Sequence, residues 1–317
     1  MMGEIRHILA GDGGKPMVPV PMPIQVPAAE GFAPVHGARL WYWDTGGQGP
    51  AVVFVHPMAG SARSWVYQQP VFARAGYRAL AYSRRNHYKS DMADKDDPGV
   101  ASEDIQGLVD YLKLSKFHLV GAAQGGNVAT DYALSHPERL LSLVLSSRTA
   151  GVKDGAVAKA VEALKPDRWG DLPRWFQEIG PSYRAANPEG VDLWIEINET
   201  TASRKGGGRQ RSANVISAEL LEAMMVPTLL ITGTADLTAP PPLVCEAARH
   251  IPNSEVAIIT ETGHSLYWEQ PEIFNRTVLD FFARHSGRGT PDGEVRTGTS
   301  HRTGGARRGS LVRTIEK

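Results

Sequence analysis

The sequence predicts an α/β fold, in which a mostly parallel central sheet is flanked by helices and carries an inserted helical segment. The first indication is that short, β-branched apolar runs alternate with amphipathic stretches, the pattern of parallel strands joined by crossover helices. The second is that this alternation breaks only once, at about residues 150–216, where aromatic residues lie among helical stretches without a strand pattern. The chain has 317 residues, of which 42% are hydrophobic and 21% charged, so it can bury one large core.

Each element is expected from its local pattern. The region Phe32–Trp43 mixes polar and apolar residues and has Gly37 for a turn, which predicts an antiparallel hairpin at the edge of the sheet. Six apolar runs bounded by turn residues are the expected parallel strands: Ala51–His56, Tyr77–Ser83, Phe117–Gly121, Leu140–Ser146, Pro227–Gly233 and Glu255–Thr260. Five amphipathic stretches are the expected helices: Ala62–Ala75, Ala101–Leu114, Gly126–Ser135, Pro242–His250 and Pro271–Ala283.

Composition divides the chain into segments. Residues 1–30 are rich in proline, which supplies no ladder donor, and we expect them to form an extended arm. Residues 31–149 and 217–286 form the expected core, and residues 150–216 form the expected helical cap. Residues 287–317 hold seven glycines and seven Lys and Arg residues but almost no large apolar residue, so we expect a disordered, solvated tail.

Charge and cysteine usage exclude several classes of protein. The 34 Lys and Arg residues balance 34 Asp and Glu residues, which removes the electrostatic argument for a nucleic acid or an anionic membrane as the main partner. No apolar run reaches the roughly 18 residues of a membrane span. Met1–Ala10 lacks the apolar stretch of a signal peptide, so we expect a cytoplasmic protein. The single cysteine, Cys245, matches no metal-ligand spacing. We also expect the protein to need no cofactor.

The segment from His118 to Asn127 has the pattern of a strand that enters a glycine-flanked turn and then a helix. Small flanking residues allow a sharp turn that presents the central side chain at a helix N-terminus above the sheet. This segment resembles the nucleophile elbow of the α/β-hydrolase superfamily, Gly-x-Ser-x-Gly, and the resemblance extends over roughly residues 32–285. Between Gly121 and Gly125, however, the nucleophile position holds Ala123, whose methyl group cannot attack a carbonyl.

Further motifs resemble those of the same superfamily and follow in its order. Val53–Gly60 is similar to the oxyanion loop after the third strand. Gly76–Ser90 is similar to a Gly-Tyr-Arg turn that continues as Arg-Gly-x-Gly-x-Ser, but two of the glycines are missing. An apolar run ends shortly before Asp236, where the family has its triad acid, and the loop with His264 is similar to the one that carries the catalytic histidine.

The resemblance implies a role for each of these residues. A hydroxyl nucleophile is weak at neutral pH, so a histidine must take its proton and a buried carboxylate must orient that histidine. His264 is therefore the expected base and Asp236 the expected acid. The backbone N–H groups of Met58 and Gln124 are the expected donors to the substrate oxyanion. Three further side chains are expected to contact the substrate: His56, Trp175 and Trp194.

Ala123 leaves three explanations open. In the first, alanine replaces a serine, which disables the enzyme or makes it trap its substrate; the intact remainder of the machinery favours this explanation. In the second, alanine is native and the pair of His264 and Asp236 acts as a general base on water or on a carbon acid, as in lyase or isomerase chemistry. In the third, the pocket is a non-catalytic receptor for a small ligand.

The resemblance implies a parent activity, which is hydrolysis of a small carboxylic ester or lactone through an acyl-enzyme. The expected partner is that small molecule, and the formation of a homo-oligomer stays open. Because this scaffold hosts many activities, the fold does not identify the substrate or its acyl-chain length.

Overall fold

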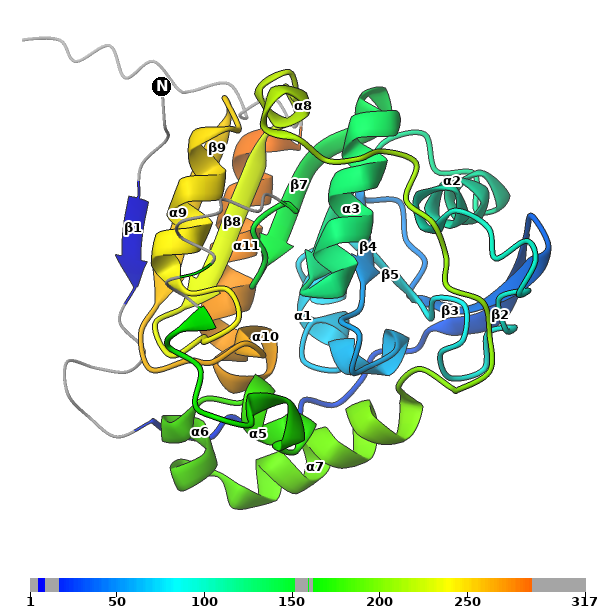
Figure 1. Ribbon diagram of the computed structural model, residues 1–317. Coiled ribbons are helices and arrows are strands. Elements are labelled where there is room, and N and C mark those ends of the chain that lie inside the picture. Colours follow the sequence, from blue (N-terminus) through cyan, green and yellow to red (C-terminus); the bar gives the residue numbers. More distant parts are fainter. Residues whose placement is uncertain (1–4, 9–16, 152–158, 160–161, 287–317) are drawn as a thin grey trace, which may run out of the picture. The chain divides into compact units, whose positions relative to one another are not determined.

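In the described part of the chain, nine strands form one sheet (Figure 1). The structure is a computed structural model that describes residues 5–8, 17–151, 159 and 162–286. In sheet order the strands are β1 (Ile5–Ile8), β9 (Ser254–Ile259), β8 (Thr228–Gly233), β7 (Leu140–Ser146), β6 (Phe117–Ala122), β4 (Ala51–Val55), β5 (Arg78–Tyr82), β3 (Ala38–Asp44) and β2 (Ala29–Val35). Neighbours are parallel from β1 to β5, whereas the β2–β3 hairpin is antiparallel and joins β5 through β3. The predicted, mostly parallel α/β fold is confirmed.

The six parallel strands predicted from apolar runs are all present, and their ends differ from the prediction by at most one residue. The hairpin turns at Gly37, whose φ of +67° suits glycine. The sequence does not predict β1, which lies in the expected arm. Four residues are too few to show an alternating pattern, and this strand is stabilised by pairing with the edge of β9, where Arg6 lies 3.1 Å from Glu255.

Helices cover both faces of the sheet (Figure 1). Alternate residues of a strand point to opposite faces, so the core has two halves. Val53 and Val55 pack in the first half, with α2 (Ala101–Tyr111), α3 (Gln124–Ser135) and α9 (Pro241–Arg249). Val52 and Phe54 pack in the second half, with α1 (Gln69–Arg74) and α11 (Pro271–His285). The remaining short helices of the core are η1 (Ala62–Trp65), η2 (Pro137–Arg139), α8 (Ala218–Glu222) and α10 (Leu266–Glu269).

The predicted helix over Ala62–Ala75 is wrong in one respect, because the chain forms η1 and α1 as two separate helices. Pro70 lies in the first turn of α1, where its missing N–H is harmless. The same residue inside a continuous helix would remove a hydrogen bond and clash with the preceding turn. Proline therefore places the break between the two helices.

The segment between β7 and α8 is here called the insert. Its described residues form the short helices η3 (Trp169–Asp171), α5 (Arg174–Glu178), α6 (Pro181–Ala186), α7 (Pro188–Asn198) and η4 (Glu199–Thr201). Figure 1 shows α5, α6 and α7 gathered at the end of the sheet toward which β7 and β8 point. The insert adds Ile179, Tyr183 and Trp194 to the second half of the core. Residues 152–158 and 160–161 of the expected cap lie outside the described residues.

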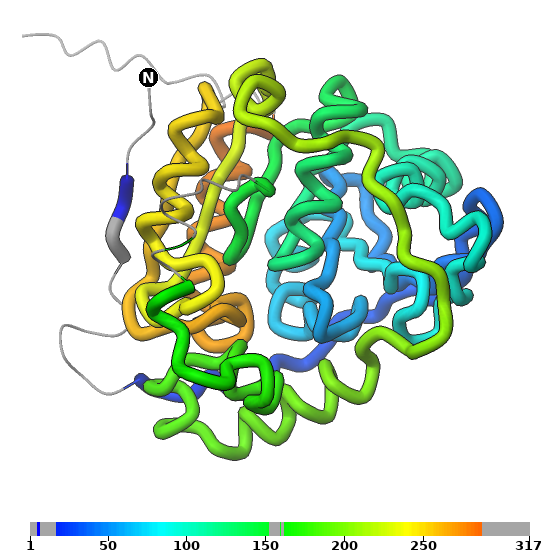
Figure 2. The backbone as a smooth tube through the Cα atoms, in the orientation of Figure 1, coloured from blue at the N-terminus to red at the C-terminus, as the bar shows by residue number. Residues whose placement is uncertain are grey.

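Residues 17–28 have no helix or strand and lead to the hairpin (Figure 2). Met17, Val20 and Ala28 pack against the second half of the core. The Gln69 side chain bonds both the N–H and the carbonyl of Val26, at 3.0 and 2.8 Å. This part of the expected arm is therefore attached to the core, while residues 1–4 and 9–16 and the expected tail at 287–317 lie outside the described residues.

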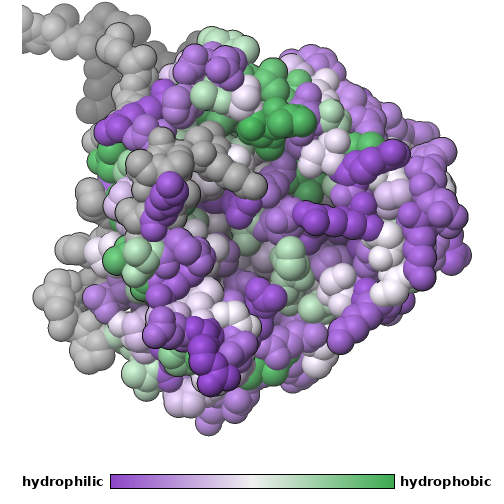
Figure 3. Space-filling model, viewed as in Figure 1, coloured by the Kyte–Doolittle hydropathy of each residue, from purple (hydrophilic) through white to green (hydrophobic). Residues whose placement is uncertain are grey.

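Figure 3 shows that hydrophilic residues cover much of this face, with a hydrophobic patch beside α8. Val215, Leu220 and Met225 are exposed in and around this helix. Because α8 precedes β8, the patch lies at the end of the sheet opposite to α5, α6 and α7. Among the described residues, no helix is long and apolar enough to cross a membrane. In the same residues, no group of three or more His, Cys, Asp and Glu side chains could hold a metal ion.

Candidate active site

The turn between β6 and α3 has the backbone of a nucleophile elbow. Ala123, at its tip, has φ +48° and ψ −115°, which residues other than glycine adopt only with strain. A Cβ atom on Gly125 would lie 2.3 Å from the Val55 carbonyl oxygen, and one on Gly121 would lie 2.6 Å from the Gly125 carbonyl oxygen. Glycine is therefore required on both sides of Ala123 for the turn to close.

Asp236 and His264 form a buried, hydrogen-bonded pair. His264 Nδ1 lies 2.8 Å from Asp236 Oδ2, and the two residues are 6% and 1% exposed. The other carboxylate oxygen, Oδ1, accepts hydrogen bonds from the backbone N–H groups of Thr238 and Ala239, at 2.8 and 2.9 Å. Since no described residue forms a hydrogen bond with His264 Nε2, this atom is the one available for proton transfer.

The sheet brings the elbow and this pair to one edge. Strands β6, β7, β8 and β9 are adjacent and parallel, so the residues after their carboxyl ends share an edge. Ala123 directly follows β6, Asp236 lies three residues beyond β8 and His264 lies five residues beyond β9. In open parallel sheets this edge is where ligands bind.

The electrostatics of the pair favour an imidazolium. Burial lowers the pKa of His264, but the carboxyl groups of Asp236 and Glu178 outweigh this effect and raise it to about 9. Burial likewise opposes ionisation of Asp236, yet the imidazole and the two N–H donors hold the pKa of its carboxyl below the ordinary value. These interactions favour a protonated imidazole on His264 beside an ionised carboxylate on Asp236.

The loop that the sequence analysis expects to bind an oxyanion follows β4. Met58 lies in this loop and is 49% exposed, and Gln124 is the first residue of α3. Among the described residues, neither backbone N–H donates a hydrogen bond, so both are free to bind an oxygen atom. Free N–H groups at a helix N-terminus favour negative charge.

His56 lies under this loop and is completely buried. Its Nδ1 donates to the Pro57 carbonyl oxygen at 2.7 Å, and its Nε2 accepts from the Arg84 N–H at 2.9 Å. Burial and the charge of Arg84 hold the pKa of His56 well below its ordinary value, so the ring is neutral. The ring supports the loop with both nitrogens, and it has no free nitrogen for the substrate contact that the sequence predicts.

The two predicted tryptophan contacts lie in the insert. Trp194, on α7, is completely buried in the second half of the core. Trp175, on α5, is partly buried and lines a cavity of about 480 Å³ with Phe176, Val191 and other residues of the insert alone. The structure does not bring either tryptophan into a described contact with Ala123 or with the Asp236–His264 pair.

The sequence analysis missed Glu178, at the end of α5. Glu178 is buried, and its main-chain oxygen accepts a hydrogen bond from the Ser265 N–H at 2.9 Å. This contact places Glu178 against the loop of residues 260–265 that carries His264, which we call the histidine loop. Among the described residues, the Glu178 carboxyl group receives one hydrogen bond, a long one of 3.4 Å from Ser265 Oγ. Burial raises the pKa of Glu178, against the opposing effects of His264 and Arg174. No motif marks this residue, because its proximity to His264 arises only when the insert folds over the sheet.

Glu269 is a second buried carboxyl group behind His264. Its side chain accepts from the N–H of Gly263 and of Gly180, each at 2.9 Å, and so joins the histidine loop to the insert. Burial raises the pKa of Glu269 to about 8 despite these donors. Next to this joint, a cavity of about 310 Å³ is lined by residues of the insert and by Ala235, Leu237 and Gly263.

The loop after β5 adopts glycine-like backbone at the two positions where the family glycines are missing. Asn86 has φ +70° and Tyr88 has φ +46°. Asn86 compensates with its side chain, which accepts from the Ala93 N–H at 2.8 Å and donates to the Gly208 carbonyl at 3.0 Å. Tyr88 packs edge-on against Trp41, with ring centroids 4.8 Å apart.

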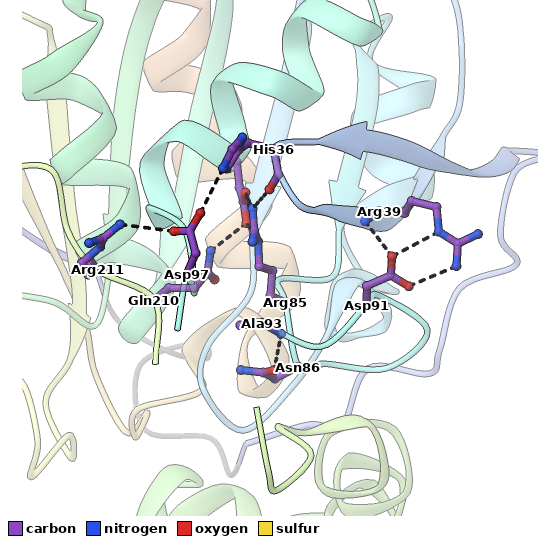
Figure 4. A network of polar contacts seen from close by, with 10 residues as sticks. His36, Arg39, Arg85, Asn86, Asp91, Ala93, Asp97, Gln210 and Arg211 are labelled. Carbon is purple, nitrogen blue, oxygen red and sulfur yellow. Dashed lines mark hydrogen bonds and ion pairs between the residues drawn. The ribbon is translucent and has the colours of Figure 1, made fainter. Parts of the chain in front are cut away.

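A polar network attaches this loop to its surroundings (Figure 4). Arg85 donates from Nη2 to Asp104 Oδ1 at 2.7 Å, and Gln210 Nε2 donates to the other oxygen of Asp104 at 2.7 Å. On the exposed side, His36 lies 3.1 Å from Asp97. The network links the hairpin, the loop and the segment that returns from the insert.

These features place the chain in a known class. A model of the alpha/beta hydrolase family matches residues 52–277, and the chain belongs to this family of hydrolase-type enzymes. The chain is 26% identical over 263 residues to 2-hydroxy-6-oxononadienedioate/2-hydroxy-6-oxononatrienedioate hydrolase of Burkholderia vietnamiensis, with 78% of this chain and 91% of that protein covered.

Solved structures share the fold. A thermophilic esterase from Thermogutta terrifontis aligns with a TM-score of 0.65 and 22% identity over 82% of this chain and 100% of that chain. The enol-lactonase from Burkholderia xenovorans LB400 aligns with a TM-score of 0.61 and 20% identity over 80% of this chain and 100% of that chain.

Proposed function

We propose that this chain has a serine-hydrolase-type site for small carboxylic esters or lactones in which Ala123 occupies the nucleophile position, so that substrate is bound without forming an acyl-enzyme. The site consists of Asp236, His264 and the oxyanion donors of Met58 and Gln124. As an alanine protein, the chain is inactive or traps its substrate.

The strained backbone of Ala123 is the observation that carries this proposal. A non-glycine residue in such a conformation costs on the order of 1–3 kcal/mol. A methyl group gains nothing from being presented at the tip of an elbow, whereas a hydroxyl at this position would lie at the same edge of the sheet as the Asp236–His264 pair. The names of the relatives, an esterase, an enol-lactonase and a dienedioate hydrolase, agree with an acyl or related carbonyl substrate.

With a serine at position 123, the site would form an acyl-enzyme in two proton-transfer steps. The serine oxygen bonds to the substrate carbonyl carbon while His264 Nε2 takes the hydroxyl proton, and the oxyanion is held by the two N–H groups. The imidazolium then gives that proton to the leaving alcohol as the ester bond breaks. Water repeats the sequence on the acyl-enzyme and releases the acid.

The test is a comparison of this chain with its Ala123→Ser variant on short aryl esters and small lactones. We expect kcat/KM to rise by roughly 10⁴-fold or more, because triad members act as a unit. Ala123→Gly is the matched control: it relieves the backbone strain without supplying a hydroxyl, so it should not raise turnover. His264→Ala in the serine variant should abolish the gain.

A second candidate function uses alanine as the native residue. It is favoured by one observation, the intact Asp236–His264 pair with a free Nε2 and the Glu178 carboxyl group nearby. In this case His264 removes a proton from water or from a carbon acid, as in lyase chemistry. The alanine chain would then turn over substrate at a rate that His264→Ala lowers and Ala123→Ser does not raise. If both the chain with Ala123 and its Ala123→Ser variant bind a ligand tightly and turn nothing over, the protein is a receptor.

A further inference from the structure

Arg148 lies between the elbow and the Asp236–His264 pair. It follows β7 by two residues, and β7 lies between β6, which leads to Ala123, and β8, which leads to Asp236. Its side-chain stem packs on the first turn of α3, where a Cβ atom on Gly126 would lie 3.0 Å from Arg148 Cβ. Its Nε donates to Asn127 Oδ1 at 2.5 Å, which anchors the guanidinium to the same turn.

Arg148 has no counter-ion among the described residues. No described carboxylate lies within ion-pair distance of its guanidinium, and its two terminal nitrogens have no hydrogen-bond partner there. Arg85, another guanidinium near this edge, is instead paired with Asp104 at 2.7 Å. A partly buried charge without a partner is unfavourable unless something else binds it.

The guanidinium shares the electrostatic field of the site. Burial lowers the pKa of Arg148, with Asp236 acting in the opposite direction, and Arg148 in turn acts to lower the pKa of His264. Glu178, another buried carboxyl group of the site, has His264, Arg174 and Asp236 as its charged neighbours. Asp236 is matched by His264, so within the described residues the positive charge of Arg148 has no counter-ion.

We propose that Arg148 binds a carboxylate carried by the substrate, so that the site selects esters or lactones that keep a free carboxylate, such as half-esters of dicarboxylic acids. This inference rests on the proposed function, whose substrate class it narrows. The two terminal nitrogens of a guanidinium present parallel N–H donors that match the two oxygens of a carboxylate. Arg148 is of intermediate exposure, so a ligand can reach those nitrogens.

The test compares binding of two ligands of similar size, monomethyl glutarate and methyl pentanoate, to the unaltered chain by calorimetry. We expect the half-ester to bind at least about tenfold more tightly than the neutral ester. Arg148→Gln should remove this preference, and Arg148→Lys should keep part of it, because an ammonium attracts the carboxylate but lacks the planar fork. Arg276→Gln, at an exposed arginine on α11, is the matched control and should keep the full preference.

Equal binding of the two ligands, or an unchanged preference in Arg148→Gln, would overturn the inference. Circular dichroism of each variant separates lost binding from lost folding. The Ala123→Ser variant distinguishes this failure from a failure of the proposed function. If it hydrolyses both esters with equal kcat/KM, the site is a hydrolase site and Arg148 does not select the substrate. If it hydrolyses neither ester while the half-ester still binds preferentially through Arg148, the carboxylate site stands and the hydrolytic function is wrong.

Discussion

Two buried residues, His264 and Glu178, decide what the site can do at a given pH. The imidazole is hydrogen-bonded to Asp236 through Nδ1, and Glu178 reaches it from the insert. With a pKa raised to about 9, His264 donates a proton more readily than it accepts one at neutral pH. The imidazolium must lose its proton before it can act as a base, which requires either a bound substrate that lowers the pKa of His264 or a higher pH.

This leads to an expected pH profile for the Ala123→Ser variant. A general base must be neutral, so kcat/KM should rise with pH through the alkaline range, toward the pKa of about 9, and not around the ordinary value of 6.5. Glu178→Gln removes one of the two carboxyl groups that raise this pKa, so the rising limb should move to lower pH, by about one unit. The measurement is kcat/KM for an aryl ester across the range of pH in which the protein stays folded.

Glu272→Gln, at an exposed carboxylate on α11, is the matched control and should leave the limb in place. If Glu178→Gln leaves the limb where it was, Glu178 does not act on His264. Arg148→Gln should move the limb in the opposite direction, because Arg148 acts to lower the pKa of His264.

At the scale of elements, the loop after β5 depends on one buried ion pair. The side chains of Arg85 and Asp104 are 1% and 4% exposed and connect the loop to α2. Asp97, in the same network, is exposed and faces His36. Asp104 and Asp97 therefore belong to one network but differ in burial, since Asp104 is buried and Asp97 is exposed.

We expect Asp104→Asn to lower the free energy of unfolding by about 3 kcal/mol, because it leaves the Arg85 charge buried without a partner. Asp97→Asn is the matched substitution at the exposed end of the network and should change this free energy by less than about 1 kcal/mol. Urea denaturation of the two variants and the parent chain measures both values. Equal effects at the two positions would mean that burial does not determine the contribution of the pair.

Local patterns are sufficient to predict most elements of this fold and only part of its site. The parallel strands are buried on both faces, so continuous apolar runs such as Leu140–Ser146 mark them directly. Ala123, Asp236 and His264 are predictable because each follows a strand within a recognisable motif. Glu178, Glu269 and Arg148 carry no such motif. Glu178 meets His264, and Glu269 meets Gly180, only when the insert is folded, and Arg148 is recognisable only in the folded protein, where no described carboxylate pairs with it.

Across the whole molecule, buried titratable groups act on stability in two opposite directions. Burial lowers the pKa of His56, His87 and His118, to about 3 for the last two. The unfolded chain therefore binds more protons than the folded protein between about pH 3 and 6.5, and stability rises with pH in that window. Glu269 and His264, with pKa values raised to about 8 and about 9, have the reverse effect. The stability they contribute is fully present below their unfolded pKa values and is lost as pH rises through about 8 and 9.

We therefore expect the free energy of unfolding to be highest near about pH 6 to 6.5 and to fall on both sides. The three histidines outweigh Glu269 below this range, and above it they become neutral in the unfolded chain as well and no longer offset Glu269 and His264. Urea denaturation at about pH 4, 6.5 and 9 measures the curve. Glu269→Gln cannot ionise and should lose less stability between about pH 6.5 and 8 than the parent chain, whereas the exposed control Glu272→Gln should follow the parent. If the free energy of unfolding rises steadily to about pH 9, the raised pKa values assigned to Glu269 and His264 are wrong. If Glu269→Gln loses as much stability above about pH 6.5 as the parent chain, the Glu269 carboxyl group is not the cause of that loss.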